Sequence, residues 1–295
     1  MDKLLGAVVE GVMLGGVYAL IALGVVVVYK ATKVFNLAHG GILMFLTYFL
    51  WWLLASRGLP LPLGLILLAV ASVLMGLGID RLLMRPMIGQ SGLITFIMTL
   101  VLGFSVIHGL AILLWGGSAR VMPEIFPSGS IGIGSVTISY TWLFSFIAAS
   151  VMFLVFVIYF RYTRSGLVMR CVSEDHLISQ SLGINVKRIF AVSWVIGCLS
   201  AATGGMLLGS MFAVDSSLGG FAIIRALPVL LLGGIESVTG AFVGAIIIGL
   251  AESMAGVYID PHVSGFRQLL PYILMVLILI VRPNGLFGLK VIRRI

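Results

Sequence analysis

The chain has 295 residues, of which 61% are hydrophobic and only 9% are charged, and its formal net charge is +8. A soluble domain carries about 25% charged residues, so one water-soluble core cannot hide this much apolar surface. The basic residues lie in short loops between apolar runs and do not cluster on a soluble face, which argues against a nucleic-acid partner. The composition therefore predicts an all-α membrane protein with several transmembrane helices.

Apolar runs close to the ~20 residues needed to cross a bilayer follow one another along the chain. They cover about residues 4–29, 37–56, 61–79, 93–115, 140–160, 189–213, 237–256 and 268–281, and a shorter run covers 222–235. The short run gives nine spans if it crosses and eight if it re-enters near Gly233 and Gly234, whereas a break in the first run gives ten. We therefore expect a bundle of 8–10 transmembrane helices that forms a single domain over residues 1–295.

The Lys and Arg residues fall unequally on the two sides of a nine-span arrangement. Thirteen of the eighteen lie on one side, Arg225 falls in or at the edge of a span, and four lie on the other side: Lys3, Arg57, Arg120 and Arg267. Since cytoplasmic loops carry the excess of Lys and Arg, this bias predicts an N-terminus outside the membrane and a cytoplasmic C-terminus.

Glycine and turn residues predict two local features. The pairs Gly11 and Gly15, Gly205 and Gly209, and Gly240 and Gly244 have the G-x-x-x-G spacing that lets helix backbones approach closely. The outer loop, residues 116–139, ends in alternating apolar and small polar residues, and this pattern predicts a short β-hairpin on the outer surface.

The longest polar stretch, residues 161–188, carries five of the eighteen Lys and Arg residues. Within it, we expect Ser173 to cap a short helix of about six to nine residues that Gly183 ends. Glu174 and Asp175 would place negative charge at the positive end of this helix. Its apolar side would consist of Leu177, Ile178 and Leu182. A helix this short is not stable alone, so we expect the apolar side to dock on a partner.

The sequence offers no motif for covalent chemistry. It lacks the G-x-x-x-x-G-K-[ST] nucleotide motif and the H-E-x-x-H and G-x-S-x-G motifs of metalloproteases and hydrolases. The four histidines lie far apart without ligand spacing: His39, His108, His176 and His262. We therefore expect neither an enzyme nor a metal or cofactor site in this chain.

Ionisable residues inside the spans are few. Glu10, Arg225 and Glu252 are the candidates, and each costs a few kcal/mol at membrane depth unless it is paired. Arg225 and Glu252 can pair across a helical hairpin, which makes a structural ion pair the first interpretation. The set is too small for a proton relay, which needs a chain of buried carboxylates or histidines. Asn36 is expected to cap the second span, beside Gly40 and Gly41, which allow tight packing.

Four segments keep the order found in a known family. They are FNLAHG at 35–40, TRSGLVMRCVSEDHLISQSLGIN at 163–185, LGGIESVTGA at 232–241 and RPNGLFG at 282–288. With them the chain resembles the branched-chain amino acid ABC permeases over nearly its whole length, and it most resembles the smaller of their two membrane subunits.

This resemblance implies a subunit of an importer in a bacterial inner membrane, surrounded by lipid. The other subunits would be a second related permease, two cytoplasmic ATPases that hold the ATP, and a periplasmic substrate-binding protein. Residues of the 161–188 loop would form the coupling helix that docks on an ATPase: Ser173, Glu174, Asp175, Leu177, Ile178, Leu182 and Gly183. The candidates for the translocation path are Asn36, His39, Arg225 and Glu252.

Two other classes of function remain open from the sequence. An ion- or proton-coupled secondary carrier for small amino acids, amides or urea would need buried carboxylates near mid-span. A structural or assembly protein would leave the amphipathic loop without a cycle to drive. The cargo of an importer of this kind is selected by its binding protein, so leucine, other amino acids, amides and urea all remain possible.

Overall fold

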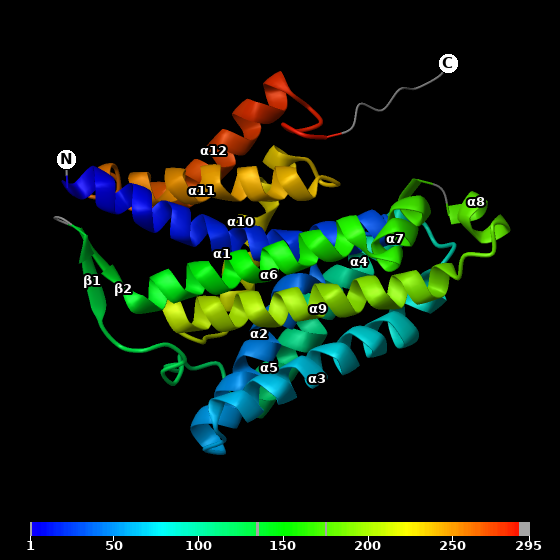
Figure 1. Ribbon diagram of the computed structural model, residues 1–295, viewed down its shortest axis with the longest axis horizontal. Helices are drawn as coiled ribbons and strands as arrows, with labels where there is room; N and C mark the ends of the chain where they lie inside the picture. The colour runs from blue at the N-terminus through cyan, green and yellow to red at the C-terminus, as the bar shows by residue number, and fades with distance from the viewer. Residues whose placement is uncertain (1, 134–135, 175, 289–295) are drawn as a thin grey trace.

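The computed structural model describes residues 2–133, 136–174 and 176–288, and the statements below refer to this part of the chain. The described residues form a helical bundle with one small hairpin (Figure 1). Seven helical segments are long and apolar enough to cross a bilayer: Lys3–Thr32, Ala38–Ser56, Leu61–Met87, Gly92–Trp115, Tyr140–Tyr162, Val186–Met211 and Val238–Tyr258. Two apolar helices are shorter: α10 (Leu218–Gly233) and α12 (Phe266–Val281). The expectation of an all-α membrane protein is confirmed.

Some of these segments change their helical winding along their length. The first four are built from α1 (Asp2–Thr32); α2 (Ala38–Trp51) and η1 (Trp52–Ser56); α3 (Leu61–Ile79), η2 (Asp80–Met84) and η3 (Arg85–Met87); and α4 (Gly92–Val101), η4 (Leu102–Ile107) and α5 (His108–Trp115). The others are α6 (Tyr140–Tyr162), α9 (Val186–Met211) and α11 (Val238–Tyr258). Because η1, η2 and η4 are π-helical, the backbone bulges at three places.

Helix α1 is the centre of the bundle. In its most apolar window 94% of the residues are buried, against 28% for the α3 segment and 22% for α6. Helices α6, α9 and α11 pack around it (Figure 1). A Cβ atom on Gly249 of α11 would lie 2.7 Å from the Cα of Gly15, so these two helices meet backbone to backbone. The close packing predicted from Gly11 and Gly15 is confirmed, although their partner is α11.

Helix α10 lies between contacts made at its two ends. It begins after Val214, which forms a β-bridge with Arg120 of the loop that precedes the hairpin. It ends at a turn where Glu236 binds Lys33, one residue beyond α1. The short run of the sequence therefore forms one helix of 16 residues, shorter than the ~20 residues that usually cross a bilayer. Since α1 is unbroken over Asp2–Thr32, the described residues contain nine apolar helical segments, and the ten-span alternative is wrong.

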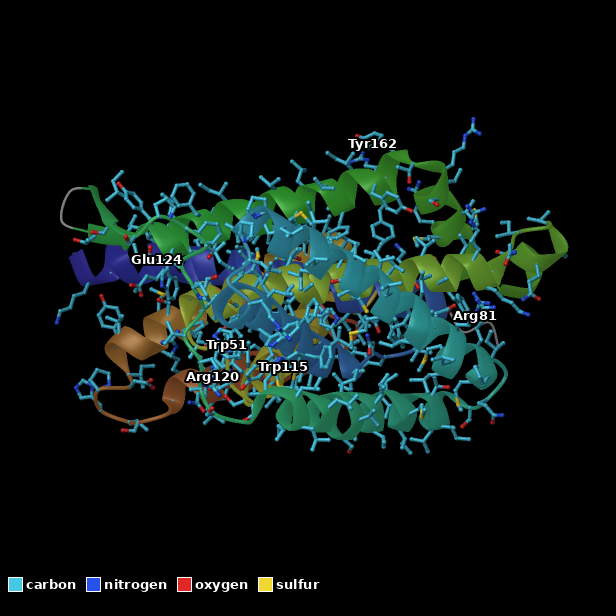
Figure 2. The ribbon with its side chains drawn as sticks, turned by 90° about the horizontal axis from the view of Figure 1, so that it is seen from below. Trp51, Arg81, Trp115, Arg120, Glu124 and Tyr162 are labelled. Atoms are coloured by element: carbon cyan, nitrogen blue, oxygen red, sulfur yellow. The ribbon has the colours of Figure 1, made fainter. Side chains whose placement is uncertain are left out.

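The predicted β-hairpin is confirmed at one end of the bundle, which we call the hairpin end. Strand β1 (Ser130–Ile133) pairs antiparallel with β2 (Val136–Ser139). The loop leading to it is held by aromatic residues that Figure 2 shows gathered beside Arg120. The guanidinium of Arg120 lies 5.0 Å from the ring centre of Trp51, and Trp115 stacks on Tyr48 with ring centres 6.0 Å apart.

The polar stretch lies at the opposite end, which we call the α8 end (Figure 1). It forms two helices, α7 (Arg164–Glu174) and α8 (His176–Ser181). A short helix was expected here, but α7 was not. The capping role expected for Ser173 is wrong, because this residue lies in the last turn of α7 and its hydroxyl donates to the carbonyl of Arg170 at 2.7 Å. Gly183 ends α8 as predicted, with a φ of +79°.

Candidate functional site

A cavity of about 710 Å³ that could hold a small molecule lies between α2, η4, α5, α10 and α12. Part of its lining lies towards the hairpin end, where Ser216 and Ser217 precede α10 and Gly265 precedes α12. Its apolar lining includes Phe104, Phe221, Ile224, Leu269 and Pro271, and its polar lining includes His108, Ser216, Ser217, Arg225, Gln268 and Tyr272. A volume of this order is typical of ligand sites in proteins.

Glycines set the shape of this cavity. A Cβ atom on Gly219 of α10 would lie 2.6 Å from the carbonyl oxygen of Gly40 on α2. A Cβ atom on Gly103 of η4 would lie 2.6 Å from the Cα of Ala38. These backbone contacts bring α10 and η4 against the same helix and leave the cavity between them. The tight packing predicted for Gly40 and Gly41 is confirmed, since Gly41 itself meets the backbone of Gly103.

Behind the cavity wall, Glu252 of α11 is the centre of a buried polar network. Its Oε1 lies 2.9 Å from both Nε and Nη2 of Arg225, and its Oε2 accepts a hydrogen bond of 3.0 Å from the hydroxyl of Tyr18. The Nε of Arg267 lies 3.5 Å from the same Oε1. The side chain of Glu252 is 0% exposed and that of Arg225 is 11% exposed. The ion pair predicted between Arg225 and Glu252 is confirmed.

Arg225 is the charged residue that faces the cavity. Its guanidinium carbon also lies 3.5 Å from the ring centre of Phe221, which lines the cavity as well. Tyr272 of α12 donates a hydrogen bond of 2.9 Å to the carbonyl of Ile224 and so joins α12 to α10 beside Arg225. The network therefore fixes the position of one cation in a largely apolar wall.

The other two path candidates lie elsewhere. Asn36 and His39 are 1% and 0% exposed and do not line the 710 Å³ cavity. His39 packs against Gly24 of α1 beside Ser200 of α9, in the core of this chain. The capping role expected for Asn36 is wrong, because α2 begins after Leu37 without a side-chain cap. The Asn36 Oδ1 and both His39 ring nitrogens have no hydrogen-bond partner among the described residues.

The expected coupling residues are partly described. Leu182 is 74% exposed. Gly183 and Ile184 donate hydrogen bonds of 3.0 Å to the carbonyls of Gln180 and Ser179, which closes the end of α8. Asp175 lies outside the described residues, as do the side chains of Glu174, Leu177 and Ile178. Helix α8 itself projects at the end of the bundle, and Figure 1 shows it far from the hairpin.

Sequence reasoning did not find Tyr18, Arg267 or the polar residues of the cavity. Tyr18 lies in the middle of a long apolar run, and a buried hydroxyl there needs a partner, which was the available signal. In the sequence, Arg267 contributes only to the balance of charges, although it lies at the start of the short apolar helix α12. The cavity residues carry no signal in a single sequence, because several elements far apart in the chain supply them.

Comparison with known proteins agrees with this architecture. Residues 7–279 match the family model described as the permease component of the branched-chain amino acid transport system. The chain belongs to this permease family. It is 33% identical to the high-affinity branched-chain amino acid transport system permease protein LivH of Salmonella typhimurium, with 95% of this chain and 94% of that protein covered. It is 31% identical to the permease protein BraD of Pseudomonas aeruginosa, with the same shares covered.

The name of a third relative, which covers less of this chain, refers to nucleosides. The nucleoside ABC transporter permease protein NupC of Lactococcus lactis is 30% identical over 160 residues, which cover 50% of this chain and 48% of that protein. The family resemblance seen in the sequence is therefore confirmed, and the chain is a multi-pass membrane permease.

Two of the four resembling segments meet in the permease at the α8 end. Leu286 and Phe287 donate hydrogen bonds of 2.8 and 3.1 Å to the carbonyls of Leu232 and Gly233, so the 282–288 segment lies on the end of α10. The same turn carries Glu236, whose carboxylate binds Lys33 at 2.7 Å. These contacts join the ends of α1, α10 and α12.

Proposed function

We propose that this chain is one of two permease subunits of an ABC importer for branched-chain or other small amino acids. Its partners are a second related permease, two cytoplasmic ATPases that hold the ATP, and a periplasmic substrate-binding protein. Membership of the permease family and the names of the two well-covered relatives support this proposal. The observation that carries the coupling role is α8, a six-residue helix beyond the end of the bundle, followed by an exposed Leu182.

The proposal includes an orientation in a bacterial inner membrane. The α8 end faces the cytoplasm and the hairpin end faces the periplasm. The distribution of Lys and Arg supports this choice, because α1, η2 and α6 place Lys33, Arg81 and Arg161 at the α8 end. Figure 2 shows Arg81 at the end away from Arg120. Ser216 and Ser217 of the cavity lining then lie towards the side from which a binding protein delivers its ligand.

In this mechanism the chain makes and breaks no covalent bond. ATP binding closes the two ATPases, which carry α8 with them. The bundle then moves as a largely rigid body from an inward-facing to an outward-facing arrangement and accepts the amino acid. The close backbone contact of α1 with α11 supports a rigid-body movement, because such packing does not deform gradually.

The test replaces Leu177 and Leu182 together by Asp. We expect the variant permease to insert and fold but to lose the ATPases on co-purification and to lose ATP-driven uptake, because buried apolar anchors dominate interfaces of this kind. Val121→Asp is the matched control, since Val121 is 84% exposed but lies in the loop at the hairpin end. Unchanged assembly and uptake in the double variant would show that α8 is not the coupling helix.

The secondary carrier is the less favoured function. Among the described residues, the buried carboxylates are Asp80 and Glu252. Asp80 is bound to Arg85 at 2.9 Å, and Glu252 is bound to two arginines. Both carboxylates are thus held in separate ion pairs and do not form a relay. Uptake by the purified chain alone, in liposomes with an ion gradient and without ATPases, would refute the importer proposal.

A further inference from the structure

The 710 Å³ cavity that Arg225 lines is separate from the proposed coupling helix α8. We propose that Arg225 binds the carboxylate of the transported amino acid in this cavity, while the apolar wall receives its side chain. This inference rests on the proposed function, since it assumes that an amino acid passes through the permease. It adds which residue binds the transported amino acid, Arg225, and which group of the amino acid is bound, the carboxylate.

The donor groups of Arg225 support a carboxylate ligand. A guanidinium has five N–H groups, and only Nε and Nη2 lie on Glu252. No nitrogen of Arg225 appears among the enclosed polar atoms without a partner in the described part of the chain. Because Arg225 lines the cavity and its side chain is 11% exposed, its remaining N–H groups are available to a ligand there. Such a fork suits a carboxylate better than it suits any neutral group.

The charge of the network supports the same ligand. Arg225 and Arg267 together carry two positive charges, and Glu252 supplies one negative charge to both. Because Arg267 is 36% exposed and does not line the cavity, the cation at the cavity wall is Arg225, and Glu252 is its buried counter-charge. No Asp or Glu is among the residues that line the cavity, so no acidic side chain approaches Arg225 from the cavity side. An anionic group on the ligand would pair with the N–H groups of Arg225 that Glu252 does not hold.

The rest of the lining defines the ligand class. The amino group of an amino acid can be accepted by neutral oxygens, such as those of Ser216, Ser217 and Gln268. The aromatic and aliphatic wall suits an apolar side chain. The π-helical turn η4 brings Phe104 to this wall, His108 follows at the start of α5, and π-helical bulges are frequent at functional sites. A small amino acid with an apolar side chain meets all three requirements, whereas urea or an amide lacks the anionic group.

The first experiment measures occupancy of the cavity directly. Ser216→Cys places a thiol in the lining, in a background where the exposed Cys171 is changed to Ser and the buried Cys198 is kept. The assembled transporter in nanodiscs is labelled with a maleimide in the presence of L-leucine, isocaproate or L-leucinol. Isocaproate lacks the amino group of leucine, and leucinol lacks the carboxylate. We expect L-leucine and isocaproate to slow labelling in a saturable way and leucinol to have no effect.

The second experiment tests Arg225 itself with a matched control. Arg225→Gln should abolish protection by L-leucine and lower uptake by about tenfold or more, the loss expected for one hydrogen-bonded charged contact. Arg267→Gln removes the other arginine from Glu252, but this residue does not line the cavity, so protection should persist. If Arg225→Gln does not assemble, Arg225→Lys serves instead. It should need more leucine for the same protection, because a lysine offers no fork.

Several results would overturn the inference. Equal loss of protection in Arg225→Gln and Arg267→Gln would show that the network only holds the structure. Protection by leucinol would show that the carboxylate is not recognised, and unchanged protection in Arg225→Lys would show that the fork of the guanidinium is not needed. Failure of the maleimide to reach Ser216→Cys in the assembled transporter would show that the second permease fills the cavity. ATP-driven uptake without any protection by leucine would overturn this inference alone, whereas absence of such uptake in the wild-type assembly would overturn the proposed function as well.

Discussion

Replacing Glu252 by Gln is expected to be among the most destabilising single changes in this bundle. The side chain is 0% exposed, accepts hydrogen bonds from Tyr18 and Arg225, and forms a longer ion pair with Arg267. Gln keeps the shape of Glu252 but removes its charge, which leaves Arg225 buried without a counter-charge. Breaking a buried ion pair from one side costs about 3–5 kcal/mol. Arg267 adds little to this cost, because its side chain is 36% exposed and can reach water.

The measurement is thermal unfolding of the purified chain in detergent. A loss of 3 kcal/mol corresponds to a decrease in Tm of about 6 °C or more for a chain of this size. Glu10→Gln is the control, since Glu10 is an exposed glutamate of α1. Surface changes of this kind alter the free energy of unfolding by no more than about 0.5 kcal/mol. The double variant Glu252→Met with Arg225→Met should recover most of the loss, because both charges of the buried pair are then absent.

A decrease in Tm for Glu252→Gln no larger than that for Glu10→Gln would refute the reasoning. It would mean that Arg225 finds another partner or water without cost. A double variant that is less stable than Glu252→Gln would also contradict it, because the loss would then come from packing and not from an uncompensated charge.

Three further predictions concern the packing and the end contacts. Gly249→Val should lower stability by about 1–3 kcal/mol, because its Cβ would lie 2.6 Å from the Gly15 amide nitrogen. Gly109→Ala is the control: a Cβ atom there would meet nothing within 4 Å, so the Tm should stay unchanged or rise. Similar decreases in Tm for Gly249→Val and Gly109→Ala would contradict the backbone contact between α11 and α1. Lys33→Glu and Glu236→Lys should each cost less than about 1 kcal/mol, since the side chains are 41% and 30% exposed, and the charge-swapped double variant should restore the Tm. Gly285→Ala should cost about 1–3 kcal/mol, because its φ is +77°. It should also release residues 282–288 from α10, which limited proteolysis measures; an unchanged cleavage pattern would count against this contact.

The spans could be predicted from the sequence because hydropathy and length alone decide them. Helix α7 could not, because Arg164 and Arg170 hide its periodic apolar side. Met169 and Val172 are 2% and 0% exposed, and α7 packs on α1 and α6. The capping role given to Ser173 is wrong for the same reason, since a cap presupposes that no helix precedes it.

The site was harder to predict because distant segments build it. The ion pair between Arg225 and Glu252 was accessible, as the two residues lie on consecutive spans. Tyr18 lies 234 positions from Glu252, and no pattern in one sequence reports such a contact. Asn36 and His39 were chosen as polar residues near a helix start, but spacing does not say which neighbour a helix faces. In the fold, both side chains are buried in the core of the chain.

The burial of α1 has a consequence for how the protein is made. This helix is synthesised before the helices that enclose it, since α6, α9 and α11 come from residues 140–258. During synthesis, Gly11, Gly15 and the hydroxyl of Tyr18 must therefore remain in lipid or beside the insertion machinery until most of the chain has followed. A truncated chain that ends before α11 would leave α1 without its backbone contact and Tyr18 without Glu252. Completion of α11 is thus the step at which the membrane protein closes around α1.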